Sequence, residues 1–356
     1  MSAPVRVLVV DDSSLIRQLL SALLSEDPEI EVVGTAPDPH VARDKIKSLN
    51  PDVITLDIEM PHMNGVEFLK KIMALRPMPV VMISTLTQAG AEITLEALEI
   101  GAVDFVPKPT HNVASELSAI ASDLQHKVKT AARSRVTARH MARSIVRPAA
   151  PQRTMSAGVR ERIVLIGAST GGVEALKEVL MGLPANCPPI LITQHMPERF
   201  TAAFAERLNR ECPMKVSEAR HNEIIEAGHA YIAPGSHHLE LIRHNGKYMT
   251  ALNDGPNVSG HRPSVDVLFK SGAKVAGPAA VGVILTGMGK DGAEGMLEMR
   301  NAGAYTLGQD EASALIYGMP RVAFERGGVI RQRPLSAMAD AIVDAAEAPI
   351  GKRPAA

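Results

Sequence analysis

The chain has 356 residues, of which 46% are hydrophobic and 22% are charged, and these values exclude a wholly disordered protein. Its 38 Lys and Arg residues nearly balance its 39 Asp and Glu residues, so no net charge attracts the whole chain to nucleic acid or to an anionic membrane. Aromatic residues make up only 3%. The length predicts two or three domains. The shortage of aromatic residues predicts cores of aliphatic side chains and Met, which favours the α/β class.

The first part of the chain alternates apolar runs of strand length with segments of helical period. The expected strands are Val5–Val10, Glu31–Thr35, Val53–Leu56, Val80–Ile83 and Asp104–Val106. The expected helices follow them at Ile16–Leu23, Val41–Leu49, Val66–Leu75, Ile93–Ile100 and Leu117–Val128. Five strands alternating with five helices predict a doubly wound, flavodoxin-like domain with a parallel sheet, over residues 4–126.

A basic segment follows this first domain. Between Lys127 and Arg162 the chain has ten Lys or Arg residues and one acid, Glu161, and prolines occur near its middle. We interpret residues 127–158 as a solvated linker, helical where it continues the preceding helix. An arm that binds nucleic acid is disfavoured because the segment has no aromatic side chain on which a base could stack.

A second alternating series predicts a larger, Rossmann-like domain over residues 159–347. Its expected strands are Ile163–Ile166, Ile190–Thr193, His229–Ala233 and Val281–Leu285. Its expected helices are Glu174–Leu180, Phe200–Asn209, Ser264–Val275 and Ala293–Asn301. An antiparallel hairpin is expected from Leu239–Ile242 and Tyr248–Leu252, which flank Asn245-Gly246. Both domains therefore belong to the α/β class with doubly wound parallel sheets.

Two observations bear on where the protein resides. The apolar run Val5–Val10 ends at the carboxylates of Asp11 and Asp12, which predicts a strand rather than a signal peptide, and no stretch has the roughly 20 apolar residues needed to cross a bilayer. The two cysteines, Cys187 and Cys212, lack the spacing of a metal site or a disulfide framework. We expect a cytoplasmic protein that is not embedded in a membrane.

Three carboxylates are expected to meet at one edge of the first sheet. Asp11 and Asp12 follow the first strand and Asp57 follows the third, and the carboxyl ends of parallel strands share one edge. Such a cluster needs a cation, and its oxygen ligands suit Mg²⁺. Lys108 and Ser84, after the fifth and fourth strands, can contact a phosphoryl oxygen there. Any one of these acids alone would be explained as a helix cap.

The phrases DD, DIEMP, ST and KP at these strand ends resemble the receiver domain of bacterial two-component response regulators. The resemblance implies that Asp57 is the phosphoacceptor. It also implies that Asp12, Asp57 and the Glu59 carbonyl bind Mg²⁺, with Asp11 assisting through water. A histidine kinase would supply the phosphoryl group.

The same resemblance assigns the residues that respond to phosphorylation. Ser84 stands where many receivers have Thr, and Phe105 stands where many have Tyr. Phe105 has no hydroxyl group with which to report the change. Lys108 is expected to hold a phosphoryl oxygen.

A nucleophilic serine is indicated at the start of the second domain. Gly167–Gly171 satisfies G-x-S-x-G directly after a predicted strand, the setting in which a tight turn exposes a serine hydroxyl. Ser169 needs a base, and His195 at the end of the next strand is the best candidate. Asp291, which again follows a strand, would orient the imidazole. All three residues are expected at the carboxyl edge of the sheet.

Binding of a dinucleotide is the main alternative for this turn. Gly167 and Gly172 match the ends of the dinucleotide fingerprint, but Ser169 replaces its central glycine, which allows the backbone to approach a pyrophosphate. No acid follows the next strand in the position that would contact a ribose. A nucleotide-dependent oxidoreductase is therefore disfavoured.

Two further alternatives are weak. His237, His238 and Glu240 could suggest a metal, but adjacent residues of a strand point to opposite faces. A transcription regulator would need a DNA-binding output domain, and the second domain has no helix-turn-helix phrase. We expect no cofactor in the second domain and no nucleic-acid partner.

The phrases GASTGG, QHMP, YIAPG, HRPSVDVLF, LTGMGKDGA and YGMP occur in this order after the receiver-like region. Together they resemble the chemotaxis protein-glutamate methylesterase family. The resemblance gives the catalytic triad as Ser169, His195 and Asp291. It assigns stabilisation of the oxyanion to the backbone at Met288 and places Thr170 beside the nucleophile.

The function implied is a phosphorylation-activated hydrolase of chemotaxis adaptation. Its substrates would be glutamate methyl esters of chemoreceptors, and it would also deamidate receptor glutamines by the same acyl chemistry. A chemotaxis histidine kinase would be the phosphodonor, and the protein would act as a monomer at receptor arrays. We expect the unphosphorylated receiver to restrict access to the catalytic edge.

Overall fold

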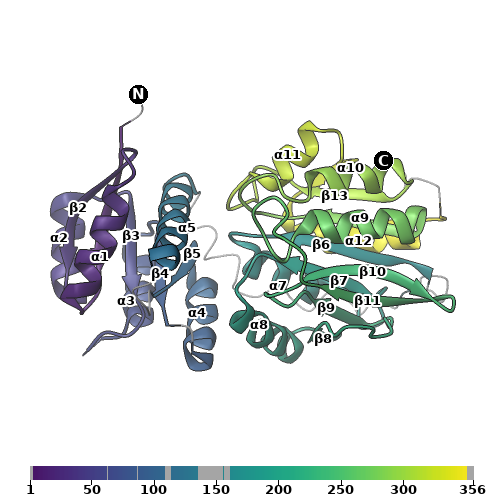
Figure 1. Ribbon diagram of the computed structural model, residues 1–356, viewed down its shortest axis with the longest axis horizontal. Coiled ribbons are helices and arrows are strands. Elements are labelled where there is room, and N and C mark those ends of the chain that lie inside the picture. The colour runs from purple at the N-terminus through teal and green to yellow at the C-terminus, as the bar shows by residue number, and fades with distance from the viewer. Residues whose placement is uncertain are drawn as a thin grey trace. The chain divides into compact units, whose positions relative to one another are not determined.

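The computed structural model describes residues 3–61, 63–85, 87–108, 114–134, 155 and 161–350. The chain divides into two compact units, Met1–Arg147 and Pro148–Ala356, each with its own parallel sheet (Figure 1). Among the described residues, no helix is both long enough and apolar enough to cross a bilayer. The predicted α/β class is confirmed in both units.

Unit 1 contains a five-stranded parallel sheet of order β2-β1-β3-β4-β5. Helices α1 and α5 pack together, as do α3 and α4. The order places the end of β1 beside the end of β3, which is the point where doubly wound sheets bind ligands. The strands are β1 Val5–Val10, β2 Ile30–Ala36, β3 Val53–Asp57, β4 Val80–Ser84 and β5 Asp104–Pro107. The helices are α1 Ser14–Ser25, α2 Pro39–Leu49, α3 Gly65–Leu75, α4 Gln88–Ile100 and α5 Ala114–Ala132.

The first residues of the expected basic linker are helical, as predicted for a segment that continues the preceding helix. Helix α5 continues to Ala132, so the boundary expected after residue 126 lies inside this helix. Lys127 forms an ion pair with Asp123 at 2.9 Å, and Lys129 forms one with Asp27 at 2.6 Å. These two lysines are therefore part of the folded unit, because acids of unit 1 pair with them. The expected linker residues 135–154 and 156–158 lie outside the described residues.

Unit 2 contains a seven-stranded parallel sheet of order β14-β13-β12-β6-β7-β9-β8. A separate antiparallel hairpin, β10 with β11, turns at Asn245 and Gly246, which both have positive φ as a two-residue hairpin turn requires. The strands are β6 Ile163–Ala168, β7 Ile190–Gln194, β8 Lys215–Glu218, β9 His229–Ile232, β10 His238–His244, β11 Lys247–Asn253, β12 Ala280–Ile284, β13 Tyr305–Gln309 and β14 Arg331–Arg333. The helices are α7 Gly172–Gly182, α8 Glu198–Glu211, α9 Val265–Val275, α10 Ala293–Asn301, α11 Met319–Glu325 and α12 Met338–Glu347.

Three strands of this sheet were not predicted. β8 and β14 are short edge strands rich in charged residues, so they carry no apolar run. β13 lies inside the sheet, but its sequence YTLGQ has buried polar residues, among them Thr306 and Gln309. Hydrogen bonds satisfy these groups: Thr306 Oγ1 donates to Gly328 O, and Gln309 Oε1 accepts from the Thr286 N–H. Helices α11 and α12 were also not predicted.

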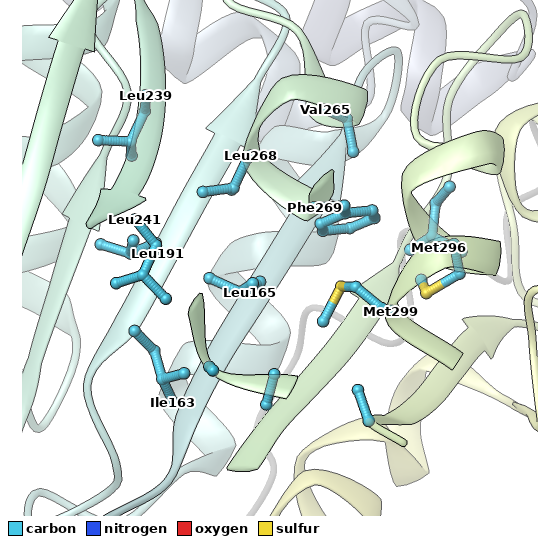
Figure 2. Packing of buried hydrophobic residues seen from close by; sticks show 14 of the residues in the cluster. Ile163, Leu165, Leu191, Leu239, Leu241, Val265, Leu268, Phe269, Met296 and Met299 are labelled. Atoms are coloured by element: carbon cyan, nitrogen blue, oxygen red, sulfur yellow. The ribbon is translucent and has the colours of Figure 1, made fainter. Parts of the chain in front are cut away.

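The core of unit 2 lies between the sheet, the hairpin and helices α9 and α10 (Figure 2). Phe269 of α9 is fully buried, as are Leu165 of β6 and Leu241 of β10. Gly272 allows α9 to approach β6 closely, because a Cβ there would lie 2.0 Å from Leu165 Cδ1. This packing determines where the N-terminus of α9 lies, and that end of the helix is part of the candidate site.

We expect Phe269→Ala to lower the free energy of unfolding of unit 2 by about 3–5 kcal/mol, because it removes a fully buried ring from this core. Urea unfolding of the full chain measures the loss. Phe324→Ala is the matched control, since the Phe324 side chain on α11 is 47% exposed and should cost much less. Equal losses for the two variants would contradict this location of the core.

Candidate functional site

Ser169 lies on a tight turn between β6 and α7. The turn needs Gly171, whose φ is +77° and whose added Cβ would lie 2.9 Å from the Leu315 side chain. The Ser169 N–H donates to Thr286 O at 3.0 Å, and the Ser169 carbonyl accepts from the Gly172 N–H at 2.7 Å. The predicted strand–turn–helix setting is therefore present, and the turn is attached to the chain that follows β12.

His195 follows β7 and lies between the serine and the aspartate. Its Nδ1 is 3.1 Å from Ser169 Oγ, and its Nε2 is 2.8 Å from Asp291 Oδ2. Because a carboxylate only accepts, Nε2 carries the proton and Nδ1 offers its lone pair to the serine hydroxyl. In the serine-protease arrangement the carboxylate binds Nδ1 instead, so the two ring nitrogens exchange roles here.

Asp291 is buried at the N-terminus of helix α9. Its Oδ1 accepts from Ser264 Oγ at 2.8 Å and from the Asp266 N–H at 3.1 Å, and its Oδ2 accepts from the Val265 N–H at 2.7 Å. Burial has the largest effect and raises the pKa of Asp291. The hydrogen bonds from His195 and from the helix end outweigh burial, and the pKa falls to about 2. Asp291 therefore stays ionised beside the imidazole.

Asp266 is a second buried acid next to Asp291. Its Oδ1 accepts from the Gly295 N–H at 2.8 Å, so it caps α10 while Asp291 caps α9. Burial raises the pKa of Asp266, and the nearby charge of Asp291 adds to this effect, whereas the Gly295 hydrogen bond opposes it. Because Asp291 accepts more hydrogen bonds, the negative charge of this pair is favoured on Asp291.

His261 is a site residue that the sequence reasoning missed. Its ring stacks on His195, with centroids 3.7 Å apart and planes 13° from parallel. It lies in the loop between the hairpin and α9, within the phrase HRPSVDVLF. The sequence gives only a weak signal for His261, because only the path of this loop brings the two histidine rings together.

Thr170 and the backbone that precedes Met288 lie near Ser169. Thr170 directly follows Ser169, and its carbonyl accepts from Thr286 Oγ1 at 3.0 Å. Met288 follows Gly287, where an added Cβ would lie 2.7 Å from Ser169 Cβ. The backbone before Met288 therefore passes directly against the serine. Stabilisation of an oxyanion by this segment stays a prediction.

The weak metal candidate in the hairpin does not form a site. His238 Nδ1 accepts from the Ser264 N–H at 3.1 Å, and His238 Nε2 donates to Pro256 O at 3.0 Å, so both ring nitrogens are engaged. Glu240 bonds the Asn253 side chain. Within the described parts of the chain, the one group of His, Cys, Asp or Glu residues arranged to hold a metal lies in unit 1.

That group is the acidic cluster of Asp11, Asp12 and Asp57, whose ligand atoms lie within 4.8 Å of one another. Lys108 Nζ lies 2.8 Å from Asp57 Oδ1 and 3.4 Å from Asp11 Oδ2. Burial raises the pKa of Asp57 to about 6 although Lys108 opposes it. Asp57 Oδ2 is buried and accepts no hydrogen bond among the described residues. An oxygen-rich, under-neutralised cluster of this kind fits Mg²⁺.

The other predicted residues of unit 1 lie around this cluster. The Glu59 N–H donates to Asp57 Oδ1 at 3.2 Å, and Glu59 lines a pocket together with Asp12. Ser84 Oγ bonds Thr94 Oγ1 of α4 at 2.6 Å rather than Asp57. Phe105 is buried, and its carbonyl accepts from Lys127 Nζ at 2.8 Å.

Comparisons with known proteins agree with these two units. The sequence matches the CheB methylesterase family over residues 164–342 and the response regulator receiver domain over residues 7–120. The chain belongs to the CheB methylesterase family. It is 58% identical over 347 residues to a Caulobacter vibrioides protein named protein-glutamate methylesterase/protein-glutamine glutaminase 1, covering 97% of this chain and 99% of that one.

Two further relatives support the same assignment. A Geobacter metallireducens protein with the same name is 54% identical over 341 residues, covering 94% of each chain. The crystal structure of the Thermotoga maritima CheB methylesterase catalytic domain is 35% identical with a TM-score of 0.50, and the match covers 51% of this chain and 97% of that domain. The receiver and the CheB-type fold of unit 2 are thus both confirmed.

We expect Asp57→Asn to stabilise unit 1 at neutral pH in the absence of divalent cations, by about 1–3 kcal/mol. The folded-state pKa of about 6 exceeds the ordinary value of 3.8, so as the pH rises the unfolded chain loses this proton first. The penalty in the wild type is therefore absent below pH 3.8, grows up to pH 6 and is complete above it.

Urea unfolding of the full chain at several pH values measures this difference. Asp44→Asn is the control, because Asp44 is an exposed acid on α2 whose ion pair with Arg43 contributes little. A stabilisation by Asp57→Asn that did not grow with pH, or that the control reproduced, would show that burial of the Asp57 charge is not its cause.

Proposed function

We propose that this chain hydrolyses glutamate methyl esters on chemoreceptors and deamidates receptor glutamines. The observation that carries the proposal is the continuous set of hydrogen bonds from Ser169 Oγ through the His195 ring to Asp291. The names of its relatives, protein-glutamate methylesterase/protein-glutamine glutaminase, support the choice of substrate.

In the acylation step Ser169 Oγ attacks the side-chain carbonyl carbon, and its proton moves to His195 Nδ1. Asp291 keeps the ring oriented and stabilises the imidazolium. Collapse of the tetrahedral intermediate breaks the ester C–O bond, and His195 returns the proton to the departing oxygen, which leaves as methanol. For a glutamine substrate the C–N bond breaks instead and ammonia leaves.

In the deacylation step water attacks the acyl-enzyme. His195 Nδ1 takes one proton from the water and then gives it to Ser169 Oγ, which restores the enzyme and releases the glutamate. We assign the oxyanion in both steps to the backbone at Met288, beside Thr170, because this segment passes directly against the serine. No cofactor is needed in unit 2 for this chemistry.

We further propose that phosphorylation of Asp57 activates the hydrolase. Asp11, Asp12, Asp57 and the Glu59 carbonyl would hold Mg²⁺, which when bound neutralises charge on the transferring phosphoryl group. Lys108 would then hold a phosphoryl oxygen. Ser84 would have to leave Thr94 to reach the phosphoryl group, and this exchange of partners would release α4.

The proposed partners follow from this scheme. Methyl-accepting chemoreceptors would be the substrate and a chemotaxis histidine kinase the phosphodonor. The protein would act in the cytoplasm at receptor arrays, as a monomer and without nucleic acid. Before phosphorylation, we propose that the receiver limits access of receptors to Ser169.

We expect Ser169→Ala to lower methanol release from methylated receptor membranes at least about a thousandfold, because the triad acts as a unit. Ser271→Ala is the matched control, and it should keep methanol release. This serine lies on α9 in the same unit, where its hydroxyl donates to Leu268 O and accepts from the Leu241 N–H of the hairpin. Near-normal methanol release by Ser169→Ala would disprove the assignment of the nucleophile.

We expect Asp57→Asn to remove the stimulation of methanol release by a small-molecule phosphodonor while leaving the basal rate. Asp44→Asn, which exchanges an exposed acid of the same unit, should keep the stimulation. Removal of Mg²⁺ by a chelator should also abolish the stimulation in the wild type. Full stimulation in Asp57→Asn would show that activation does not depend on this carboxylate.

A further inference from the structure

Gln194 connects the two turns that carry the nucleophile and the base. It is the last residue of β7, and its side chain is buried. Its Nε2 donates to the Ser169 carbonyl at 3.0 Å and to the His195 carbonyl at 3.1 Å. Since both partners are acceptors, the amide group must present its nitrogen to them.

The oxygen of the same amide is left without a partner. Gln194 Oε1 is buried and accepts no hydrogen bond among the described residues. A buried acceptor without a donor costs about 1–3 kcal/mol, which an apolar side chain of the same size would avoid. This cost offsets much of what the two hydrogen bonds from Nε2 contribute, so the amide adds little net stability.

The start of α7 leaves room for this oxygen. A Cβ on Gly172 would lie 2.0 Å from Gln194 Oε1, so a glycine is needed there as long as the amide keeps its orientation. Gly171 is explained differently, by its positive φ. Gly172 is needed for a different reason from Gly171, because a Cβ there would lie 2.0 Å from Gln194 Oε1 and 2.8 Å from Ala168 Cβ.

We propose that Gln194 is a positioning residue that sets the separation between Ser169 Oγ and His195 Nδ1. The backbone of His195 is held at two points. Its N–H donates to Ala168 O at 3.1 Å, and its carbonyl accepts from the Gln194 amide. The Ser169 carbonyl is likewise held by Gly172 and Gln194. One planar amide therefore fixes both turns relative to each other.

This role predicts an effect on the chemical step rather than on receptor binding. The Gln194 amide donates to two backbone carbonyls of the site, and the residue is only 3% exposed, so it offers no surface to a receptor. A shift of about 1 Å between reacting groups can cost on the order of a hundredfold in rate. The inference rests on the proposed hydrolase activity.

The test compares Gln194→Met and Gln194→Glu in the full chain. Met keeps the size of the side chain without its N–H groups, and Glu keeps its shape but has acceptors where the donors were. We expect kcat for methanol release to fall roughly 10- to 100-fold in both variants, with KM within about twofold of the wild-type value. Thermal unfolding shows whether each variant is folded. If Gln194→Met does not fold, the kcat of Gln194→Glu decides the result.

Gln125→Met is the matched control, because the Gln125 amide also donates to a backbone carbonyl, that of Leu23, but in unit 1. It should leave kcat unchanged. A folded Gln194→Met with wild-type kcat, or a loss that appears in KM alone, would overturn the inference. Ser169→Ala in the same assay separates the two proposals: if it stays active the hydrolase assignment fails, and if it is inactive the Gln194 result stands by itself.

Discussion

The structure of unit 2 depends on one interaction, the seating of the buried Asp291 carboxylate on the N-terminus of helix α9. Two backbone N–H groups and the Ser264 hydroxyl donate to the carboxylate, in addition to His195. The position of α9 depends in turn on Gly272, which brings the helix against β6. Core packing thus determines the position of the N-terminus of α9. This helix end holds the Asp291 carboxylate, and the carboxylate in turn orients the His195 imidazole.

Unit 1 handles a buried carboxylate in the opposite way. Burial raises the pKa of Asp57 to about 6. The ion pair with Lys108 and the hydrogen bond from the Glu59 N–H lower this pKa but do not offset the effect of burial. Its second oxygen accepts no hydrogen bond from the described residues. The fold therefore completes the environment of Asp291 and leaves that of Asp57 incomplete. An incompletely neutralised carboxylate is the one suited to meet a cation and a phosphoryl donor.

Local patterns predicted the alternating elements and the strand ends that carry Ser169, His195 and Asp291, because each depends on a run of adjacent residues. They failed for β13, because its polar groups form hydrogen bonds with residues distant in sequence, such as Gly328. They also failed for Lys127, because a run of basic residues does not show that acids elsewhere in the unit pair with it. His261 and Gln194 were missed for the same reason. A stacked ring and a bridging amide are defined by contacts across the fold and leave no period or spacing in the sequence.

The residues that the sequence patterns missed complete the restraint of the His195 ring. Ser169 and Asp291 hold His195 within its plane, through one ring nitrogen each. His261 lies against its face and limits tilting out of the plane, while Gln194 holds the peptide from which the ring extends. With the ring held in each of these ways, the proton transfers of the proposed mechanism would change its charge while its position stays fixed. In the proposed mechanism such a preorganised base would not have to be reoriented in each cycle, which would lower the barrier to proton transfer.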